Sequence, residues 1–201
     1  MPRKGTVLLS IWAVAVYLPK AWLMTVGTDV REFLLDGGDA NGSNKIVAID
    51  LRQDFIDLGQ DLYKGPTPNI EFRTANLLEP GTKLDDLKGK VNLLYTGAVF
   101  HLFDEQQQRV FAEAIATLLA TSGEVVVFGT HRGAKVKSDR IHRSGLKLYS
   151  HSPESWKELW TDILGADAGN WQINAQLRYS WTAAEYVDEN TPVLQWSLWR
   201  K

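Results

Sequence analysis

Apolar residues follow two spacings along most of the chain, and the two kinds of stretch alternate. Short runs typical of strands lie at 45–50, 69–75, 91–96 and 124–129. Apolar residues spaced three or four positions apart, as on one face of a helix, lie at 29–35, 55–62, 105–119 and 153–163. Two alternating runs, at 171–179 and 192–199, close the chain. Strands that alternate with helices predict an α/β fold with a mostly parallel sheet covered on both faces.

Residues that favour helix ends support these boundaries. Asp104 is placed to cap the third helix, and Gly123 follows its end. Ser152 is a second N-cap residue, with Pro153 at the first helical position. The charged segment 132–147 has two interpretations. It is either a lid or charged patch that meets an acidic substrate, or a solvated loop.

Composition narrows the classes of function. The chain has 201 residues, 44% of them hydrophobic and 23% charged, which is the balance of a globular domain. The net charge of −2 argues against nucleic-acid binding, which needs a concentrated basic face. The lack of cysteine excludes a disulfide scaffold, a thiolate zinc site and a cysteine nucleophile. Asp36, Asp39 and His142 do not make a convincing metal site, so no metal is expected.

The first 25 residues differ from the rest. Two basic residues precede a nearly unbroken apolar run at 6–18, a pattern similar to a secretory signal but too short for a comfortable bilayer span. Three interpretations remain open: a cleaved signal or membrane anchor, a buried strand of the core, or a segment foreign to the fold. The lack of cysteine favours a cytoplasmic location, with an anchor or signal left open.

Polar residues follow two of the predicted strands at their carboxyl ends, where ligands bind to parallel sheets. Asp50 ends the strand at 45–50 and is followed by Leu51; a carboxylate there accepts both hydroxyls of a ribose. Asn76 and Leu77 follow the next strand, where an amide meets the adenine amine and a leucine packs on the ring. The alternatives are a helix cap for Asp50 and an ordinary loop asparagine.

A third strand end supplies small residues and a histidine. Thr96 and Gly97 allow a ligand to approach the backbone closely, and His101 follows four residues later. A histidine at this place is a candidate to orient or deprotonate a substrate, although a single histidine is more often structural.

These strand ends occur in the order and spacing of a nucleoside-binding sheet, and four segments carry a more specific likeness. The chain resembles class I S-adenosylmethionine-dependent methyltransferases of fungal secondary-metabolite clusters, which modify meroterpenoid and polyketide intermediates. The segments are Asp29-Val30-Arg31, Phe55-Ile56-Asp57-Leu58-Gly59-Gln60-Asp61-Leu62, Phe100-His101-Leu102-Phe103 and Tyr149-Ser150-His151-Ser152-Pro153-Glu154-Ser155-Trp156. The likeness runs from about Val26 to the C-terminus.

The resemblance implies a Rossmann-like class I methyltransferase sheet of seven strands, mostly parallel with an antiparallel C-terminal strand. It implies S-adenosylmethionine as the cofactor and transfer of a methyl group to an oxygen, often a carboxylate, of a hydrophobic small molecule. By this likeness the cofactor-binding residues are Gly27, Asp50, Leu51, Asn76, Leu77, Thr96 and Gly97. A carboxylate acceptor needs no general base; for a hydroxyl acceptor His101 is the first candidate base, before His131 and His151.

The chain departs from the family at its N-terminal end. Family members have a first strand ending in a glycine-rich turn of the type Leu-Asp-x-Gly-Cys-x-x-Gly, of which only Val26-Gly27-Thr28-Asp29 remains. We therefore expect an atypical segment at 1–25 and a methyltransferase-like domain at 26–201. If residues 6–15 fill the place of the first strand, the sheet still closes.

The altered N-terminal segment keeps further functions open. The first is an O-methyltransferase that acts on a fungal secondary metabolite. The alternatives are an inactive methyltransferase-like partner subunit and a cofactor-independent isomerase or cyclase. Homodimer formation is left open as well.

Overall fold

The computed structural model describes residues 7–11, 28–35, 44–64, 69–81, 83–142, 144–179 and 192–201. The strands are β1 (Val7–Ile11), β2 (Lys45–Asp50), β3 (Ile70–Thr74), β4 (Leu93–Gly97), β5 (Val125–Arg132), β6 (Ser138–Ile141), β7 (Lys147–Ser150), β8 (Trp171–Arg178) and β9 (Val193–Arg200). The helices are α1 (Thr28–Leu35), α2 (Gln53–Leu62), α3 (Glu105–Leu118) and α4 (Pro153–Leu164), with short 3₁₀ turns η1 (Asp85–Leu87), η2 (Phe100–Leu102) and η3 (Gly165–Asn170).

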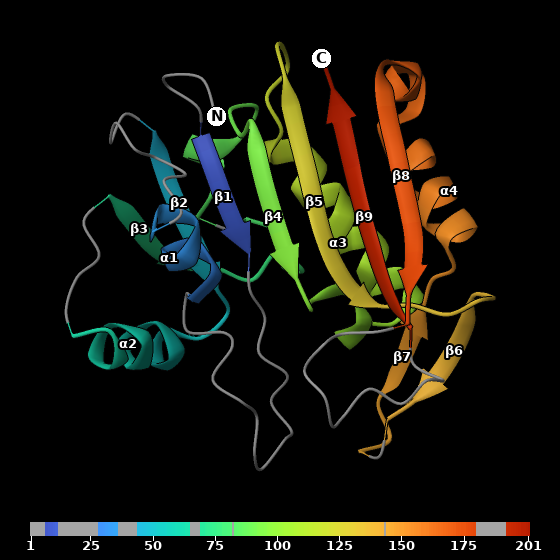
Figure 1. Cartoon of the computed structure of the whole chain (residues 1–201), viewed down its shortest axis with the longest axis horizontal. Coiled ribbons are helices and arrows are strands. Elements are labelled where there is room, and N and C mark those ends of the chain that lie inside the picture. The colour runs from blue at the N-terminus through green and yellow to red at the C-terminus, as the bar shows by residue number, and fades with distance from the viewer. Residues whose placement is uncertain are drawn as a thin grey trace.

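Seven strands form one sheet in the order β3-β2-β1-β4-β5-β9-β8 (Figure 1). The first five strands of this order are parallel, whereas β9 runs antiparallel to both β5 and β8. The predicted mostly parallel sheet with an antiparallel C-terminal strand is confirmed. Residues 7–11 pair with β2 and β4 and take an interior place in the sheet, in line with the interpretation of this segment as a strand. The division of the chain at Val26 stays a prediction.

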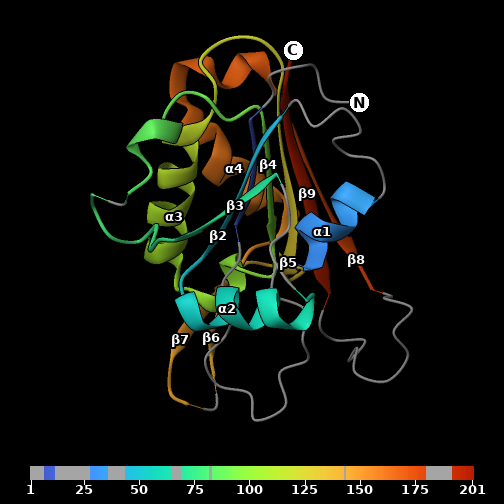
Figure 2. The same ribbon diagram turned by 90° about the vertical axis from the view of Figure 1, so that its left-hand side faces the viewer.

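Helices lie on both sides of the sheet (Figure 2). Helices α3 and α4 cover one face, where Leu94 of β4 and Val127 of β5 are buried against Ile115 of α3. On the other face Val30 of α1 packs against β2, where Ile46 belongs to a second, smaller core. The alternating burial along β5 and β9 follows from the pleat, which sends successive side chains to opposite faces.

Aromatic rings fill the core beneath α3 and α4. Phe100 stands edge-on to Phe111 at a centroid distance of 4.9 Å and to Trp156 at 4.7 Å. Trp156 in turn packs 4.9 Å from Trp196. Because all four side chains are at most 3% exposed, this cluster fixes η2 against both helices and the C-terminal strand.

The charged segment 132–147 contains strand residues as well as turns. Strand β5 continues to Arg132, three residues beyond the predicted end, and β6 pairs with β7 as an antiparallel hairpin. The hairpin turn is closed by the His142 N–H, which donates to the Leu146 carbonyl at 2.9 Å. In Figure 1 the hairpin lies beyond the carboxyl ends of β4 and β5. Within the described residues, no helix combines the length and apolar character needed to cross a bilayer.

Candidate functional site

Strand register brings the predicted cofactor residues to one edge of the sheet. Ile11 of β1 is aligned with Ile49 on one side and with Thr96 on the other. Asp50 and Gly97 therefore each lie one residue further toward the carboxyl edge, two strand spacings apart, or roughly 10 Å. An acid and a glycine therefore lie on either side of the end of β1, at the edge where ligands bind in such sheets. Gly27, the remaining glycine of the turn, lies outside the described residues.

Asp50 is buried although it ends a strand. Its side chain is 4% exposed, and Oδ1 accepts a hydrogen bond from the Arg52 N–H at 2.9 Å. Burial raises the pKa of Asp50 to about 6, and the nearby Asp54 acts in the same direction, against the hydrogen bonds from Arg52 and Leu51. The guanidinium of Arg52 pairs with Asp54 instead of neutralising Asp50. Among the described residues, the hydrogen bonds to Asp50 come from the backbone N–H groups of Arg52 and Leu51, which leaves part of the acceptor capacity of the carboxylate unused by them.

Asn76 and Leu77 lie beside Asp50, since the Ala75 N–H donates to the Asp50 carbonyl at 3.1 Å. Asn76 Oδ1 accepts from the Leu78 N–H at 3.1 Å, which makes a local turn of the kind that Asn favours. Leu77 is 5% exposed and belongs to the core. The loop asparagine predicted as the alternative is therefore present, and a second lone pair of Oδ1 remains for a ligand. Leu51 is exposed beside this loop.

The end of β4 is shaped by small residues. Thr96 is 1% exposed, and its Oγ1 is buried with no partner. A Cβ at Gly97 would collide with the ring of Tyr95, so this position requires glycine. Ala98 follows with φ 56°, a left-handed conformation that is uncommon for a residue with a side chain. Such strain is concentrated at ligand sites, and here it turns the chain from β4 into η2.

His101 lies in η2, directly after this turn. Its Nδ1 is buried with no hydrogen-bond partner. Burial lowers the pKa of His101 to about 4, and the charges of Arg140 and Arg132 lower it further. Arg140 of β6 donates from Nη2 to the His101 carbonyl at 3.5 Å. The sequence did not single out Arg140, because nothing in the charged segment shows which residue the hairpin turns toward η2.

Each of the other two candidate bases has one ring nitrogen within hydrogen-bond distance of a neighbour and a buried Nε2 without a partner in the described part of the chain. His131 lies in the aromatic core, where its Nδ1 accepts a hydrogen bond from Trp196 Nε1 at 3.1 Å. His151 Nδ1 and Ser155 Oγ lie 2.9 Å apart at the start of α4, next to the N-cap. His101 lies in η2 directly after the end of β4, and the choice among the three histidines stays a prediction.

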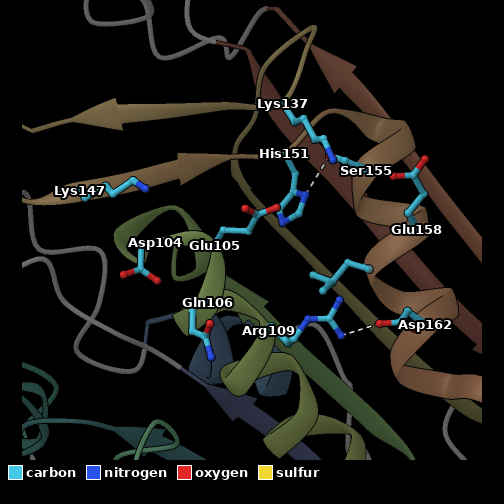
Figure 3. Close-up of a pocket in the computed structure, with 11 residues that line it drawn as sticks. Asp104, Glu105, Gln106, Arg109, Lys137, Lys147, His151, Ser155, Glu158 and Asp162 are labelled. Carbon is cyan, nitrogen blue, oxygen red and sulfur yellow. Dashed lines mark hydrogen bonds and ion pairs between the residues drawn. The ribbon is translucent and has the colours of Figure 1, made fainter.

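A hollow of about 530 Å³ lies between α3, α4 and the hairpin. Figure 3 shows Glu105, Arg109 and Lys137 around it, and Arg109 forms an ion pair with Asp162 at 2.6 Å. Acids and bases share this lining, and none of the predicted cofactor residues contributes to it. In the described part of the chain, no group of three acidic or histidine side chains is arranged to hold a metal ion.

Sequence comparison relates the chain to fungal enzymes. It is 29% identical to the O-methyltransferase phiE of a fungal species over 75% of this chain and 50% of that protein. It is 30% identical to the Asnovolin E/Chermesin D methyltransferase nvfJ of Aspergillus novofumigatus, over 68% of this chain and 49% of that protein. The chain is a homologue of fungal secondary-metabolite methyltransferases. It spans about half the length of these relatives, and no protein-family model matches it.

Solved structures agree on the fold. The chain superposes on phosphoethanolamine N-methyltransferase 2 of Haemonchus contortus with a TM-score of 0.64 at 9% identity, covering 100% of this chain and 50% of that one. It superposes on the 1,6-didemethyltoxoflavin-N1-methyltransferase of Burkholderia thailandensis with a TM-score of 0.59 at 12% identity, covering 98% and 72%. This chain therefore has the Rossmann-like class I methyltransferase fold.

Proposed function

We propose that this chain binds S-adenosylmethionine and transfers its methyl group to an oxygen of a hydrophobic fungal secondary metabolite. The observation that carries the proposal is the buried carboxylate of Asp50, which lies level with Gly97 across β1 and one residue beyond Thr96. Sequence relatives named as fungal methyltransferases, and structures solved with S-adenosylhomocysteine, support the same cofactor.

The residues at the edge suit this cofactor. Part of the acceptor capacity of Asp50 is assigned to the ribose hydroxyls, and the second lone pair of Asn76 Oδ1 is assigned to the adenine amine, next to the largely buried Leu77. The buried hydroxyl of Thr96 lacks a partner in the described part of the chain, and we assign that partner to the methionine part of the cofactor. A buried polar atom without a partner is rare in a folded protein and is explained when a ligand supplies the partner.

Methyl transfer depends mainly on how the methyl donor and the acceptor atom are positioned. When bound, S-adenosylmethionine supplies an electrophilic methyl group on a sulfonium sulfur. The residues of the edge hold the donor and acceptor in line, which is sufficient for a large rate enhancement in a displacement of this kind. With a pKa of about 4, His101 is neutral at pH 7 but a weak base. This favours an acceptor that is already ionised, such as a carboxylate, over a hydroxyl that must lose a proton.

Calorimetric titration with S-adenosylmethionine tests the proposal. We expect micromolar binding by the chain and a loss of at least about tenfold in affinity in Asp50→Ala, because a charge-assisted hydrogen bond to the ribose disappears. Asp61→Ala is the matched control, because it removes an exposed carboxylate at the far end of α2 that does not affect Asp50. Absence of binding by the folded chain, or equal affinity in Asp50→Ala, would refute the cofactor assignment.

A further inference from the structure

Two buried polar atoms without partners belong to His101, which follows the end of β4, and to Arg140 of the hairpin. Nδ1 of His101 and Nε of Arg140 each have less than 1 Å² of exposed surface, and neither finds a hydrogen-bond partner. The two residues are neighbours, since Arg140 donates from Nη2 to the His101 carbonyl. A buried donor left unpaired costs about 1–3 kcal/mol, and more when it is charged.

The surroundings of these atoms are positive. Asp139, the acid next to Arg140 in β6, points to the opposite face of the strand and pairs with Lys147 at 3.3 Å. Among the described residues, no acidic side chain forms an ion pair with Arg140. Consistently, burial and the charge of Arg132 lower the pKa of Arg140, and Arg140 itself lowers the pKa of His101. An anion is the group that is missing from this arrangement.

The hairpin is held firmly over η2. The Tyr149 N–H of β7 donates to the Phe103 carbonyl at 3.0 Å, directly after η2. Gln108 of α3 is fully buried and donates from Nε2 to the carbonyls of both Phe103 (3.1 Å) and Tyr149 (2.9 Å). Arg140 is therefore presented to His101 by a fixed strand pair, at the edge where β4 ends and where a substrate meets the cofactor site.

We propose that Arg140 and His101 form an anion-binding subsite that holds a carboxylate of the substrate. The Arg140 Nε–H and a proton on His101 Nδ1 donate to its two oxygens, a geometry that suits a planar carboxylate better than a neutral ester or ketone. Arg140 thus acts as a specificity-determining residue of the hairpin. The inference rests on the proposed function in that the carboxylate is taken to belong to the methyl-accepting molecule.

The experiment uses sodium benzoate as the probe and the full chain without cofactor. The Nε–H resonance of Arg140, identified by its absence in the spectrum of Arg140→Lys, is followed by NMR at constant ionic strength set with chloride. We expect a saturable shift with benzoate and none with methyl benzoate at the same concentration. Benzoate affinity, measured on the backbone amide of His101, falls at least about tenfold in Arg140→Gln.

Lys147→Gln is the matched control, because it removes one positive charge from the same hairpin at an exposed position. It is expected to change benzoate affinity less than twofold. Equal responses to benzoate and methyl benzoate, or unchanged affinity in Arg140→Gln, would overturn the subsite and leave a structural pair bridged by water. The wild-type titration alone decides the matter if Arg140→Gln fails to fold. Since no cofactor is present, the benzoate titration tests the subsite independently of whether the chain binds S-adenosylmethionine.

Discussion

Several residues at the carboxyl edge of the sheet have features that cost folding free energy. Asp50 is buried beside Arg52, yet that guanidinium pairs with Asp54. Thr96 and His101 likewise bury polar atoms without partners. Each of these features costs free energy in the folded chain, and each is expected where a ligand completes the arrangement. These positions follow from strand ends and were predictable from the sequence; the missing partners were not, because they depend on three-dimensional contacts.

The raised pKa of Asp50 predicts how the free energy of unfolding depends on pH. Its folded pKa of about 6 lies above the ordinary value of 3.8, so the folded state binds the proton more tightly. The stabilisation from protonation is complete below about pH 3.8 and is lost as the pH rises through 6. Asp50→Asn, which stays neutral, is therefore expected to raise the free energy of unfolding by about 1 kcal/mol at pH 7.5 and to change it little at pH 4.

Urea unfolding at the two pH values measures this difference, and Asp61→Asn, at an exposed position of α2, serves as the control. The same Asp50→Asn protein is expected to bind S-adenosylmethionine more weakly. A variant that is less stable than wild type at pH 7.5 would show that the carboxylate is a structural cap, the alternative that the sequence left open.

At the scale of elements, the hairpin and η2 depend on contacts between distant segments. The pattern of apolar residues predicted α3, α4 and the strands of the sheet, because each shows a clear period. It did not predict β6: Ser138-Asp139-Arg140-Ile141 has no alternation, and the strand exists through its pairing with β7. The approach of Arg140 to His101 was unpredictable for the same reason, since the contact joins positions 39 residues apart.

Gln108 of α3 connects the segment after η2 to β7 of the hairpin through two hydrogen bonds. Its amide donates to the carbonyls of Phe103 and Tyr149, so Gln108→Ala removes both hydrogen bonds and leaves a cavity in the core, although the Phe103 carbonyl keeps the Tyr149 N–H. We expect a loss of about 2–4 kcal/mol in the free energy of unfolding, together with weaker benzoate binding. Gln106→Ala, on the exposed side of the same helix, is the control and should cost less than about 0.5 kcal/mol. Thermal and urea unfolding measure both; equal stabilities would show that the hairpin is held by other contacts.

At the scale of the molecule, the sheet consists of two parts joined by one short strand. Strands β3 and β2 lie on one side, and β4, β5, β9 and β8 lie on the other, with β1 between them. The sequence offered three interpretations of the apolar segment that contains residues 7–11, and strand pairing decides among them for these five residues. The edge that carries Asp50 and Gly97 exists because β1 holds the two parts in register.

A proline in β1 tests this arrangement. Leu9 is aligned with Val47 of β2 and Leu94 of β4, in the middle of the ladder. Leu9→Pro removes a backbone N–H from a central strand and is expected to lower the free energy of unfolding by at least about 3 kcal/mol, whereas Leu9→Val keeps the N–H and the strand propensity. Hydrogen exchange should show loss of protection at the amides of β2 and β4 together. If both variants unfold at the same urea concentration, another segment of the chain occupies the place between β2 and β4, and the alignment of Asp50 with Gly97 loses its basis.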